Sequence, residues 1–308
     1  MTLISTEAMN KPLQTKIFNH HSFQGIDFLN NDTDLWLPFY GGNKVRKFMH
    51  IEREVAASGK NALVTTGGIQ SNHCRTAALF SVNNGWKCVL VLHGAEDEFY
   101  KQKGNALLMR MSGAECIFVE PAQIGPAMDN AMIGLEERGF KPFYVYGGGH
   151  TGAGVRAYEE WVMELAGNID ERDIPDHIFL ASGTGSTQAG IMVGLKEAGW
   201  TKTQVHGISV ARNSEAGIEG IIEAAAMTGK GYSKDQVNFY DQYLFGGYGK
   251  YTVQLREFIQ SVAENTGIIL DTTYSGKAFF GMIDLIEKRK LKGKFLFWNT
   301  GGLLNLMA

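Results

Sequence analysis

The chain has 308 residues, a formal net charge of −3 at pH 7 and a hydrophobic fraction of 44%. This composition is that of a folded globular protein and excludes a disordered chain, and the length allows two ordinary domains. Because no run of like charge accompanies the small net charge, we expect no nucleic acid and no membrane surface as the main partner, and a small molecule is favoured.

Four short apolar runs in the first half of the chain predict buried strands that are closed by turn residues. They are "NALVTTGG" ending at Gly68, "WKCVLVLHG" ending at Gly94, "AECIFVEP" ending at Pro121 and "KPFYVYGGG" ending at Gly149. Amphipathic stretches such as "VRKFMHIEREVAASG" and "GNALLMRMSG" predict helices around them, the latter with a glycine where a helix should stop.

A second set of strand-like runs follows, namely "DHIFLASGTG", "VHGISVA", "GIILDTTYSG" and "KFLFWNTGG". Strands that alternate with helices predict parallel sheets, so the chain is expected to form two parallel α/β sheets side by side with a seam near Gly149. Ligands of such sheets bind beyond the carboxyl ends of the strands and in the cleft between domains, and the glycine clusters of this chain follow strand-like runs.

The first candidate site is the turn from Gly183 to Thr187, which joins a strand-like run to a helical segment. Its glycines, hydroxyls and helix N-terminus are typical of a phosphate site. An ordinary capped turn is the alternative. The turn is neither a Walker loop nor a G-x-G-x-x-G motif, and no acid is placed to bind a ribose after the next strand, so a nicotinamide site is disfavoured.

The second candidate site lies in "TTGGIQSNHCRTAA", where Ser71, Asn72 and His73 open a predicted helix after two glycines. A carboxylate fits the backbone amides of these three residues, with the Ser71 hydroxyl and the Asn72 amide as directional partners. The alternatives are a plain N-cap for Ser71 and a packed helix residue for His73.

The third candidate is Lys44, which stands directly after Gly41, Gly42 and Asn43 in "FYGGNKVRKF". Taken alone it is a surface cation next to Arg46 and Lys47. With two anion sites elsewhere, a second interpretation competes, in which its amine forms a Schiff base with an aldehyde whose phosphate lies in the turn from 183 to 187.

Six ordered motifs carry a resemblance to a known family: "GGNKVRK", "TTGGIQSNHCR", "SGTGSTQAG", "GYG", "DTTYSGKAFFGM" and "NTGG". From about Tyr40 onward the chain resembles the pyridoxal-phosphate (PLP) enzymes that include D-cysteine desulfhydrase and 1-aminocyclopropane-1-carboxylate deaminase. The resemblance implies the two-domain, tryptophan-synthase-β-like fold of type II, with open parallel sheets and helices on both faces. It also implies a large PLP-binding domain (1–52 and 150–308), a small domain (53–149) and a homodimer.

The resemblance assigns roles residue by residue. Lys44 matches the lysine that binds the PLP aldehyde, Lys47 a phosphate contact and Asn72 the partner of the ring hydroxyl. Three further groups follow: the phosphate cup of Gly183, Thr184, Gly185, Ser186 and Thr187; the substrate-carboxylate site of Ser71, Asn72 and His73; and the pocket tyrosines Tyr248 and Tyr274.

Two positions separate the branches of the family. Cyclopropane-opening deaminases have Glu and Leu where this chain has Ser275 and Thr300, which match the desulfhydrases. A carboxylate beside the pyridine nitrogen would keep it protonated, whereas a hydroxyl donates to an unprotonated nitrogen. Asn299 departs from the His of many relatives.

The function expected is β-elimination from a D-amino acid, with D-cysteine giving pyruvate, ammonia and hydrogen sulfide. Lys44 would remove the Cα proton, Tyr248 or Tyr274 would assist the leaving group and Ser71 would move a proton on the other face. The alternatives are 1-aminocyclopropane-1-carboxylate deaminase, D-serine dehydratase or racemase, a non-enzymatic PLP carrier, and a nicotinamide-dependent oxidoreductase.

Three cysteines without a C-x-x-C pair argue against a disulfide framework and a thiolate metal site, so we expect no metal and a reducing, cytoplasmic location. The N-terminal stretch "MTLISTEAMNKPLQTK" lacks a charged start followed by an apolar run, and no segment approaches 18 uninterrupted apolar residues. We therefore expect neither an export signal nor a membrane span.

Overall fold

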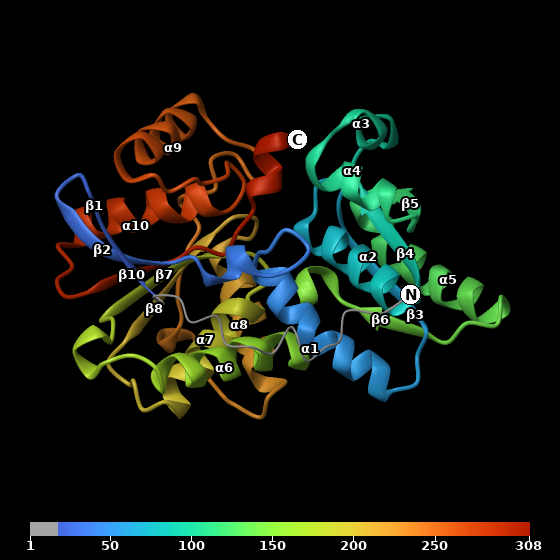
Figure 1. Ribbon diagram of the computed structural model, residues 1–308, viewed down its shortest axis with the longest axis horizontal. Helices are drawn as coiled ribbons and strands as arrows, with labels where there is room; N and C mark the ends of the chain where they lie inside the picture. The colour runs from blue at the N-terminus through green and yellow to red at the C-terminus, as the bar shows by residue number, and fades with distance from the viewer. Residues whose placement is uncertain (1–17) are drawn as a thin grey trace.

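The computed structural model describes residues 18–308, and the expected pair of α/β sheets is present in them. Figure 1 shows the larger sheet with its helices in one half of the molecule and the smaller sheet in the other, with helix α1 (Asn43–Ala57) running between them. The N-terminal stretch examined for an export signal lies outside the described residues.

The smaller sheet has four parallel strands in the order β5-β4-β3-β6. Their bounds are β3 Ala62–Gly68, β4 Lys87–His93, β5 Glu115–Val119 and β6 Pro142–Val145. One face packs on apolar side chains of α1, α2 (Asn72–Asn84) and α4 (Gly104–Met111), and the other packs on α5 (Ile124–Glu137). Side chains alternate between these two cores along β3, as expected of a strand that is buried on both faces.

The larger sheet has six strands in the order β1-β2-β10-β7-β8-β9. Their bounds are β1 Asn19–Phe23, β2 Ile26–Asn31, β7 His177–Ser182, β8 Gln204–Ser209, β9 Asn238–Tyr240 and β10 Phe295–Trp298. All neighbours are parallel except β1 and β2, which form an antiparallel hairpin at the edge. The sheet is therefore parallel except at the β1 edge.

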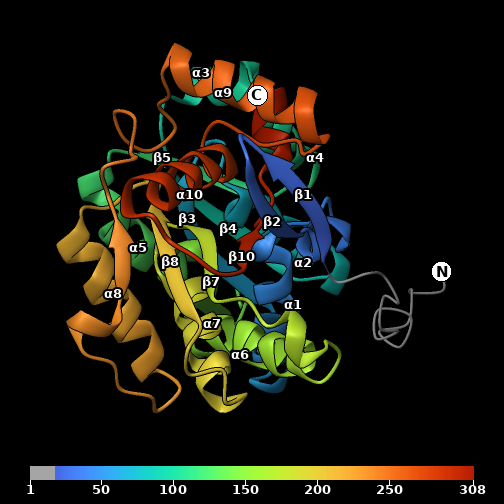
Figure 2. The same cartoon turned by 90° about the vertical axis from the view of Figure 1, so that its left-hand side faces the viewer.

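Helices cover both faces of the larger sheet (Figure 2). One face packs on α9 (Val253–Thr266) and α10 (Ser275–Arg289), and the other on α6 (Gly152–Ala166), α7 (Ser186–Glu197) and α8 (Ser214–Ala226). The remaining helices are short: α3 Glu96–Lys101 and the 3₁₀ turns Thr33–Trp36, Pro121–Gln123, Gly147–Gly149, Glu171–Asp173, Lys234–Gln236 and Leu303–Met307. Among the described residues no helix combines the length and apolar character that crossing a membrane requires.

One predicted strand is wrong. The run "GIILDTTYSG" is extended coil that leads into α10, although Ile268 and Leu270 are buried. The Asp271 carboxylate accepts hydrogen bonds from the amides of Thr273, Tyr274 and Ser275, so a side chain satisfies this backbone in place of a neighbouring strand. The sequence analysis also missed β1, β2 and the three-residue strand β9.

The four strands of the smaller sheet lie between residues 62 and 145, and the other six lie outside this range. This arrangement supports the division that we propose, with a small domain of 53–149 and a large domain of 1–52 and 150–308, of which residues 1–17 lie outside the described part. The chain thus leaves the large sheet after β2 and returns to it at β7.

Candidate active site

The turn before α1 has an unusual backbone. Phe39, Tyr40, Gly41 and Gly42 all have positive φ angles, of 54°, 67°, 64° and 94°. A Cβ atom at Gly41 would lie 2.4 Å from the carbonyl oxygen of Leu35, so no other residue fits there. Left-handed backbone at the two aromatic residues costs roughly 1–2 kcal/mol each, and strain of this kind often marks functional sites.

The side chain of Arg75, on α2, holds this turn in place. Its guanidinium donates hydrogen bonds to the carbonyl oxygens of Phe39 and of Gly41, the latter over 3.1 Å. Arg75 is buried, and burial lowers its pKa to about 10. The small-sheet half of the molecule thereby fixes the chain that presents Lys44.

Two lysine amines meet at one carbonyl oxygen. Nζ of Lys44 donates to the oxygen of Gly148 over 3.1 Å, and Nζ of Lys47 donates to the same oxygen over 3.3 Å and to Oγ of Ser186 over 2.8 Å. Burial lowers the pKa of Lys44 to about 8. Burial, followed by the nearby charge of Lys44, lowers the pKa of Lys47 well below its ordinary value.

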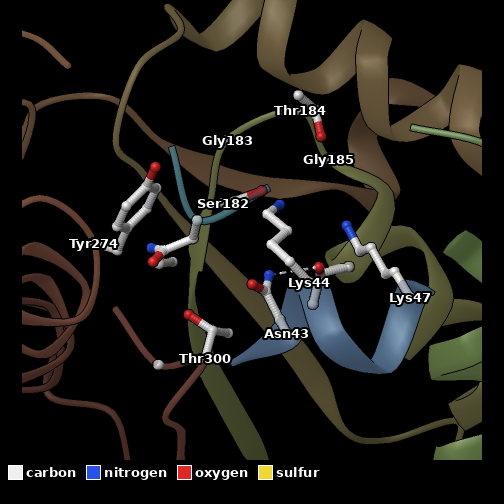
Figure 3. A pocket seen from close by; sticks show the side chains of 13 residues that line it. Asn43, Lys44, Lys47, Ser182, Gly183, Thr184, Gly185, Tyr274 and Thr300 are labelled. Atoms are coloured by element: carbon white, nitrogen blue, oxygen red, sulfur yellow. Dashed lines mark hydrogen bonds between the residues drawn. The ribbon is translucent and has the colours of Figure 1, made fainter. Parts of the chain in front are cut away.

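Among the described residues, none that lines the pocket around these amines carries a carboxylate. Figure 3 shows Lys44 and Lys47 extending from α1 toward the turn of Gly183 to Gly185, with Tyr274 on the other side of Lys44. Its lining consists of Asn43, Lys44, Lys47, Asn72, Ala181, Ser182, Gly183, Thr184, Gly185, Thr187, Tyr274, Thr300 and Gly301. The buried amine of Lys47 and the half-buried amine of Lys44, without an acid in the pocket lining to pair with them, suit an anionic ligand.

The predicted phosphate cup faces this pair of amines. Gly185, at φ 95°, is the N-cap of α7, and no side chain caps this helix, so its first amides are free for an anion. A Cβ at Gly185 would lie 2.8 Å from Ile221 Cγ1, so the glycine is required. Nδ2 of Asn43 donates to Oγ1 of Thr187 over 3.1 Å and links the cup to α1.

Gly148 is a residue of the site that the sequence analysis missed. At φ 72° it lies in the turn after β6, and a Cβ there would come within 2.9 Å of the Thr184 side chain and 3.5 Å of Nζ of Lys44. Only a glycine leaves this space open. The run of three glycines from 147 to 149 was the available signal, and it was interpreted as the end of a strand and as the seam between the two sheets.

At the other candidate turn, Ser71 is the N-cap of α2. Its Oγ accepts from the amide of Cys74 over 3.2 Å. Asn72 lines the pocket, and its Oδ1 accepts from Nδ2 of Asn105 over 2.9 Å, which turns its own amide nitrogen toward the ligand space. Asn105 is fully buried and was also missed, because an asparagine inside a helical run gives no signal.

The side chain of His73 faces the core. Its Nε2 lies 2.7 Å from Oγ1 of Thr65, and this hydroxyl already donates to the carbonyl oxygen of Val145, so His73 is the donor. Its ring packs on Phe48 with centroids 5.3 Å apart. Burial, then the Lys44 charge, lowers its pKa well below the usual range. Only its backbone is left for the proposed carboxylate site.

The two predicted tyrosines are brought together. The hydroxyls of Tyr248 and Tyr274 lie 2.6 Å apart; Tyr274 lines the pocket, while Tyr248 is 39% exposed and lines an adjoining groove with His93. Burial raises the pKa of Tyr248 to about 12 and that of Tyr274 well above its usual value. Both are therefore neutral hydroxyls at physiological pH.

Of the two positions that separate the branches of the family, Thr300 lines the pocket and Ser275 does not. Thr300 lines the pocket, and its carbonyl oxygen accepts from the amide of Asn43 over 2.9 Å. Ser275 does not line it, because its hydroxyl donates to Oδ1 of Asp271 over 2.7 Å. The Oδ1 atom of Asn299, the residue that departs from the family, accepts from the amide of Gly301 over 3.2 Å.

Comparison with known proteins decides the family. The sequence model for the family "Pyridoxal-phosphate dependent enzyme" matches residues 34–301. The chain belongs to this family. The putative 1-aminocyclopropane-1-carboxylate deaminase of Pyrococcus furiosus is 33% identical over 91% of this chain and 85% of its own length. The D-cysteine desulfhydrase of Klebsiella pneumoniae is 30% identical over 87% of this chain and 84% of its own.

Solved structures agree with this assignment. The crystal structure of a homologue of 1-aminocyclopropane-1-carboxylate deaminase aligns with a TM-score of 0.80 and 32% identity, covering 92% of this chain and 86% of its own. The cysteine synthase of Entamoeba histolytica, at 17% identity and a TM-score of 0.63 over 92% of this chain and 82% of its own, shares the fold. The expected fold class, family and PLP dependence are thus confirmed. The alternative of a nicotinamide-dependent oxidoreductase is therefore rejected.

The residues of this PLP enzyme fit its cofactor. The uncapped N-terminus of α7 and the Lys47 amine suit a phosphate. The space that a Cβ at Gly148 would fill lies beside Nζ of Lys44, which is the amine that an aldehyde requires. Hydroxyl and amide groups, and no carboxylate, make up the rest of the polar lining.

Proposed function

We propose that this PLP enzyme catalyses β-elimination from D-amino acids, with D-cysteine giving pyruvate, ammonia and hydrogen sulfide. The observation that carries the proposal is the carboxylate-free lining with a hydroxyl, Thr300, at the branch position. Bound PLP withdraws electrons from Cα of the amino acid, and without an acid to protonate its ring it does so less strongly. Elimination of a thiolate tolerates this weaker electron withdrawal, because the departing thiolate itself takes the electron pair released at Cα.

The proposed roles follow from the contacts. Lys44 binds the aldehyde, and its Nζ, with a pKa lowered to about 8, takes the Cα proton. The phosphate is held by Lys47 with Gly183, Thr184, Gly185, Ser186 and Thr187. Asn72 contacts the ring hydroxyl through the amide nitrogen that Asn105 leaves free.

The substrate roles are proposals of the same kind. The amides of Ser71, Asn72 and His73 at the N-terminus of α2 bind the substrate carboxylate. The hydroxyl pair of Tyr248 and Tyr274 gives a proton to the departing sulfur, because both groups are neutral donors. The Ser71 hydroxyl accepts from Cys74, which leaves its own proton available on the other face.

The experiment is a substrate panel of D-cysteine, L-cysteine, D-serine and 1-aminocyclopropane-1-carboxylate, with detection of keto acids and of sulfide. We expect pyruvate and sulfide from D-cysteine and no 2-oxobutyrate from the cyclopropane substrate. Lys44→Ala should abolish turnover, whereas Lys202→Ala, at an exposed lysine, should not. The opposite pattern, with 2-oxobutyrate and no sulfide, assigns the enzyme as the deaminase.

Two further expectations remain proposals. A homodimer rests on the family resemblance and is tested by light scattering of the purified protein. The cytoplasmic location rests on the cysteine content and is tested by cell fractionation.

A further inference from the structure

Ser182 has a buried hydroxyl without a partner. It is the last residue of β7, lines the pocket and is 2% exposed, and no hydrogen bond to its Oγ exists within residues 18–308. A buried hydroxyl that loses water without gaining a partner is unfavourable by about 1–3 kcal/mol. Such an atom in the wall of a ligand pocket is normally matched by a group of the ligand.

Ser182 ends β7, Thr300 follows the neighbouring strand β10, and both line the same pocket. Leu180 of β7 pairs with Trp298 of the parallel neighbour β10. Two residues further along each chain stand Ser182 and Thr300, and both line the pocket. Figure 3 shows the two side chains on the same side of Lys44 as Tyr274. Two hydroxyls at or just beyond the ends of adjacent strands therefore line the pocket on the side of Tyr274.

The other polar groups nearby are already engaged. The carbonyl oxygen of Ser182 accepts from the amide of Val210 over 3.2 Å, so its backbone is satisfied and only the hydroxyl is left over. Lys47 donates to Ser186, and Ser275, the other hydroxyl expected near the ring, donates to Asp271. The Ser182 hydroxyl is therefore free to bind a ligand, whereas the Ser275 hydroxyl is bound to the Asp271 carboxylate.

We propose that the hydroxyl of Ser182 binds PLP at the ring-nitrogen edge, alongside Thr300 and in the place expected for Ser275. This inference rests on the proposed role of Thr300. The single lone pair of the ring nitrogen accepts from one of the two hydroxyls, and the other hydroxyl donates to the oxygen of the first. A hydroxyl donates this hydrogen bond without transferring its proton, so the ring stays unprotonated. Ser182 thus acts on the electron-withdrawing strength of the cofactor as well as on its affinity.

The test compares Ser182→Ala with Ser209→Ala. Ser209 is a matched control, because it pairs with Ser182 across β7 and β8 and is buried, but its hydroxyl donates to the carbonyl oxygen of Arg212. Apoprotein of each variant is titrated with PLP and with pyridoxal, which lacks the phosphate, and the visible absorption band and melting temperature are recorded.

Four results are expected. Ser182→Ala should weaken the binding of PLP and of pyridoxal alike, by about three- to tenfold for one lost hydrogen bond. It should shift the visible band, and it should leave the apoprotein at least as stable as the native apoprotein, because an unpartnered hydroxyl is removed. Ser209→Ala should lower the melting temperature and leave the band unchanged.

Two outcomes would overturn the proposal. An unchanged band with weaker binding of PLP only would assign Ser182 to the phosphate. Unchanged affinity and spectrum would show that it does not touch the cofactor. Neither the affinity for PLP nor the visible band involves a substrate. The proposed contact of Ser182 and the proposed elimination activity are therefore tested independently, and either can be disproved without the other.

Discussion

Lys44 and Lys47 present two amines to one carbonyl oxygen in a pocket without an acid. Both pKa values are lowered, chiefly because burial disfavours the charged forms. The pocket therefore suits an aldehyde, which needs an uncharged amine. It also suits a phosphate, which would accept hydrogen bonds from the amines and favour their charged forms.

The rate at which apoprotein takes up PLP should follow the ionisation of Lys44. Only the neutral amine attacks an aldehyde. With a pKa lowered to about 8, the neutral fraction of Lys44 increases about tenfold for each unit by which the pH rises toward 8, and it levels off at higher pH. Stopped-flow absorbance at constant PLP between pH 6.5 and 9.5 measures this. A rate that does not change with pH over this range would contradict the lowered pKa.

At the residue scale, chemistry and turn glycines coincide in the sequence at Lys44 and in the turn from 183 to 187, and the fold brings these two segments to one pocket. The sequence could not reveal that Ser275 turns to Asp271, or that Ser182 is left without a partner. Both facts depend on which side of a strand end or helix end a small hydroxyl faces, and no pattern in the sequence encodes this.

At the scale of elements, the segment before α10 shows how a side chain can replace a strand neighbour. Asp271 is fully buried, and its two oxygens accept four hydrogen bonds, from the amides of Thr273, Tyr274 and Ser275 and from the Ser275 hydroxyl. The short apolar run there predicted a strand, because hydropathy does not reveal that the buried Asp271 side chain binds the amides of the turn that leads into α10. The segment fixes the backbone of Tyr274.

Replacing this carboxylate should therefore affect both stability and substrate binding. Asp271→Ala removes a buried carboxylate and leaves the groups that it binds without a partner, so we expect the free energy of unfolding to fall by about 2 kcal/mol. The KM for D-cysteine should also rise, because Tyr274 is displaced. Urea denaturation and steady-state kinetics measure the two effects.

Asn213→Ala is the matched control. Asn213 caps α8 by accepting from the amide of Ala216 over 2.9 Å, and it does not line the pocket. This variant should lose stability while keeping its KM. Equal changes of KM in both variants would mean that Asp271 acts only through general stability.

At the scale of the whole molecule, the pocket around Lys44 combines parts from both halves. Asn72 comes from the helix that follows β3 of the small sheet, whereas Thr300 and the turn from 183 to 187 follow strands of the large sheet. The number of halves and their α/β class could be predicted from the alternating runs. The order of the strands could not be predicted, because the pairing of strands that are distant in the sequence is not encoded in local sequence patterns.

Loading with PLP should therefore stabilise the molecule as a whole. A ligand that binds only the folded state adds about 2.7 kcal/mol when its free concentration is a hundred times its Kd. We expect one melting transition that moves to higher temperature on addition of PLP, with a smaller shift in Lys44→Ala and the native shift in Lys202→Ala. Calorimetry measures this, and identical melting of apoprotein and holoprotein would contradict it.

The strand β10 lies inside the large sheet, between β2 and β7, although it is translated last of all the strands. A nascent chain therefore cannot close this sheet while residues 295–301 are still within the ribosome, however well the small sheet has folded by then. Until that moment β2 and β7 lack their common neighbour and Thr300 is missing from the pocket wall. The complete pocket wall therefore forms only after synthesis of this segment.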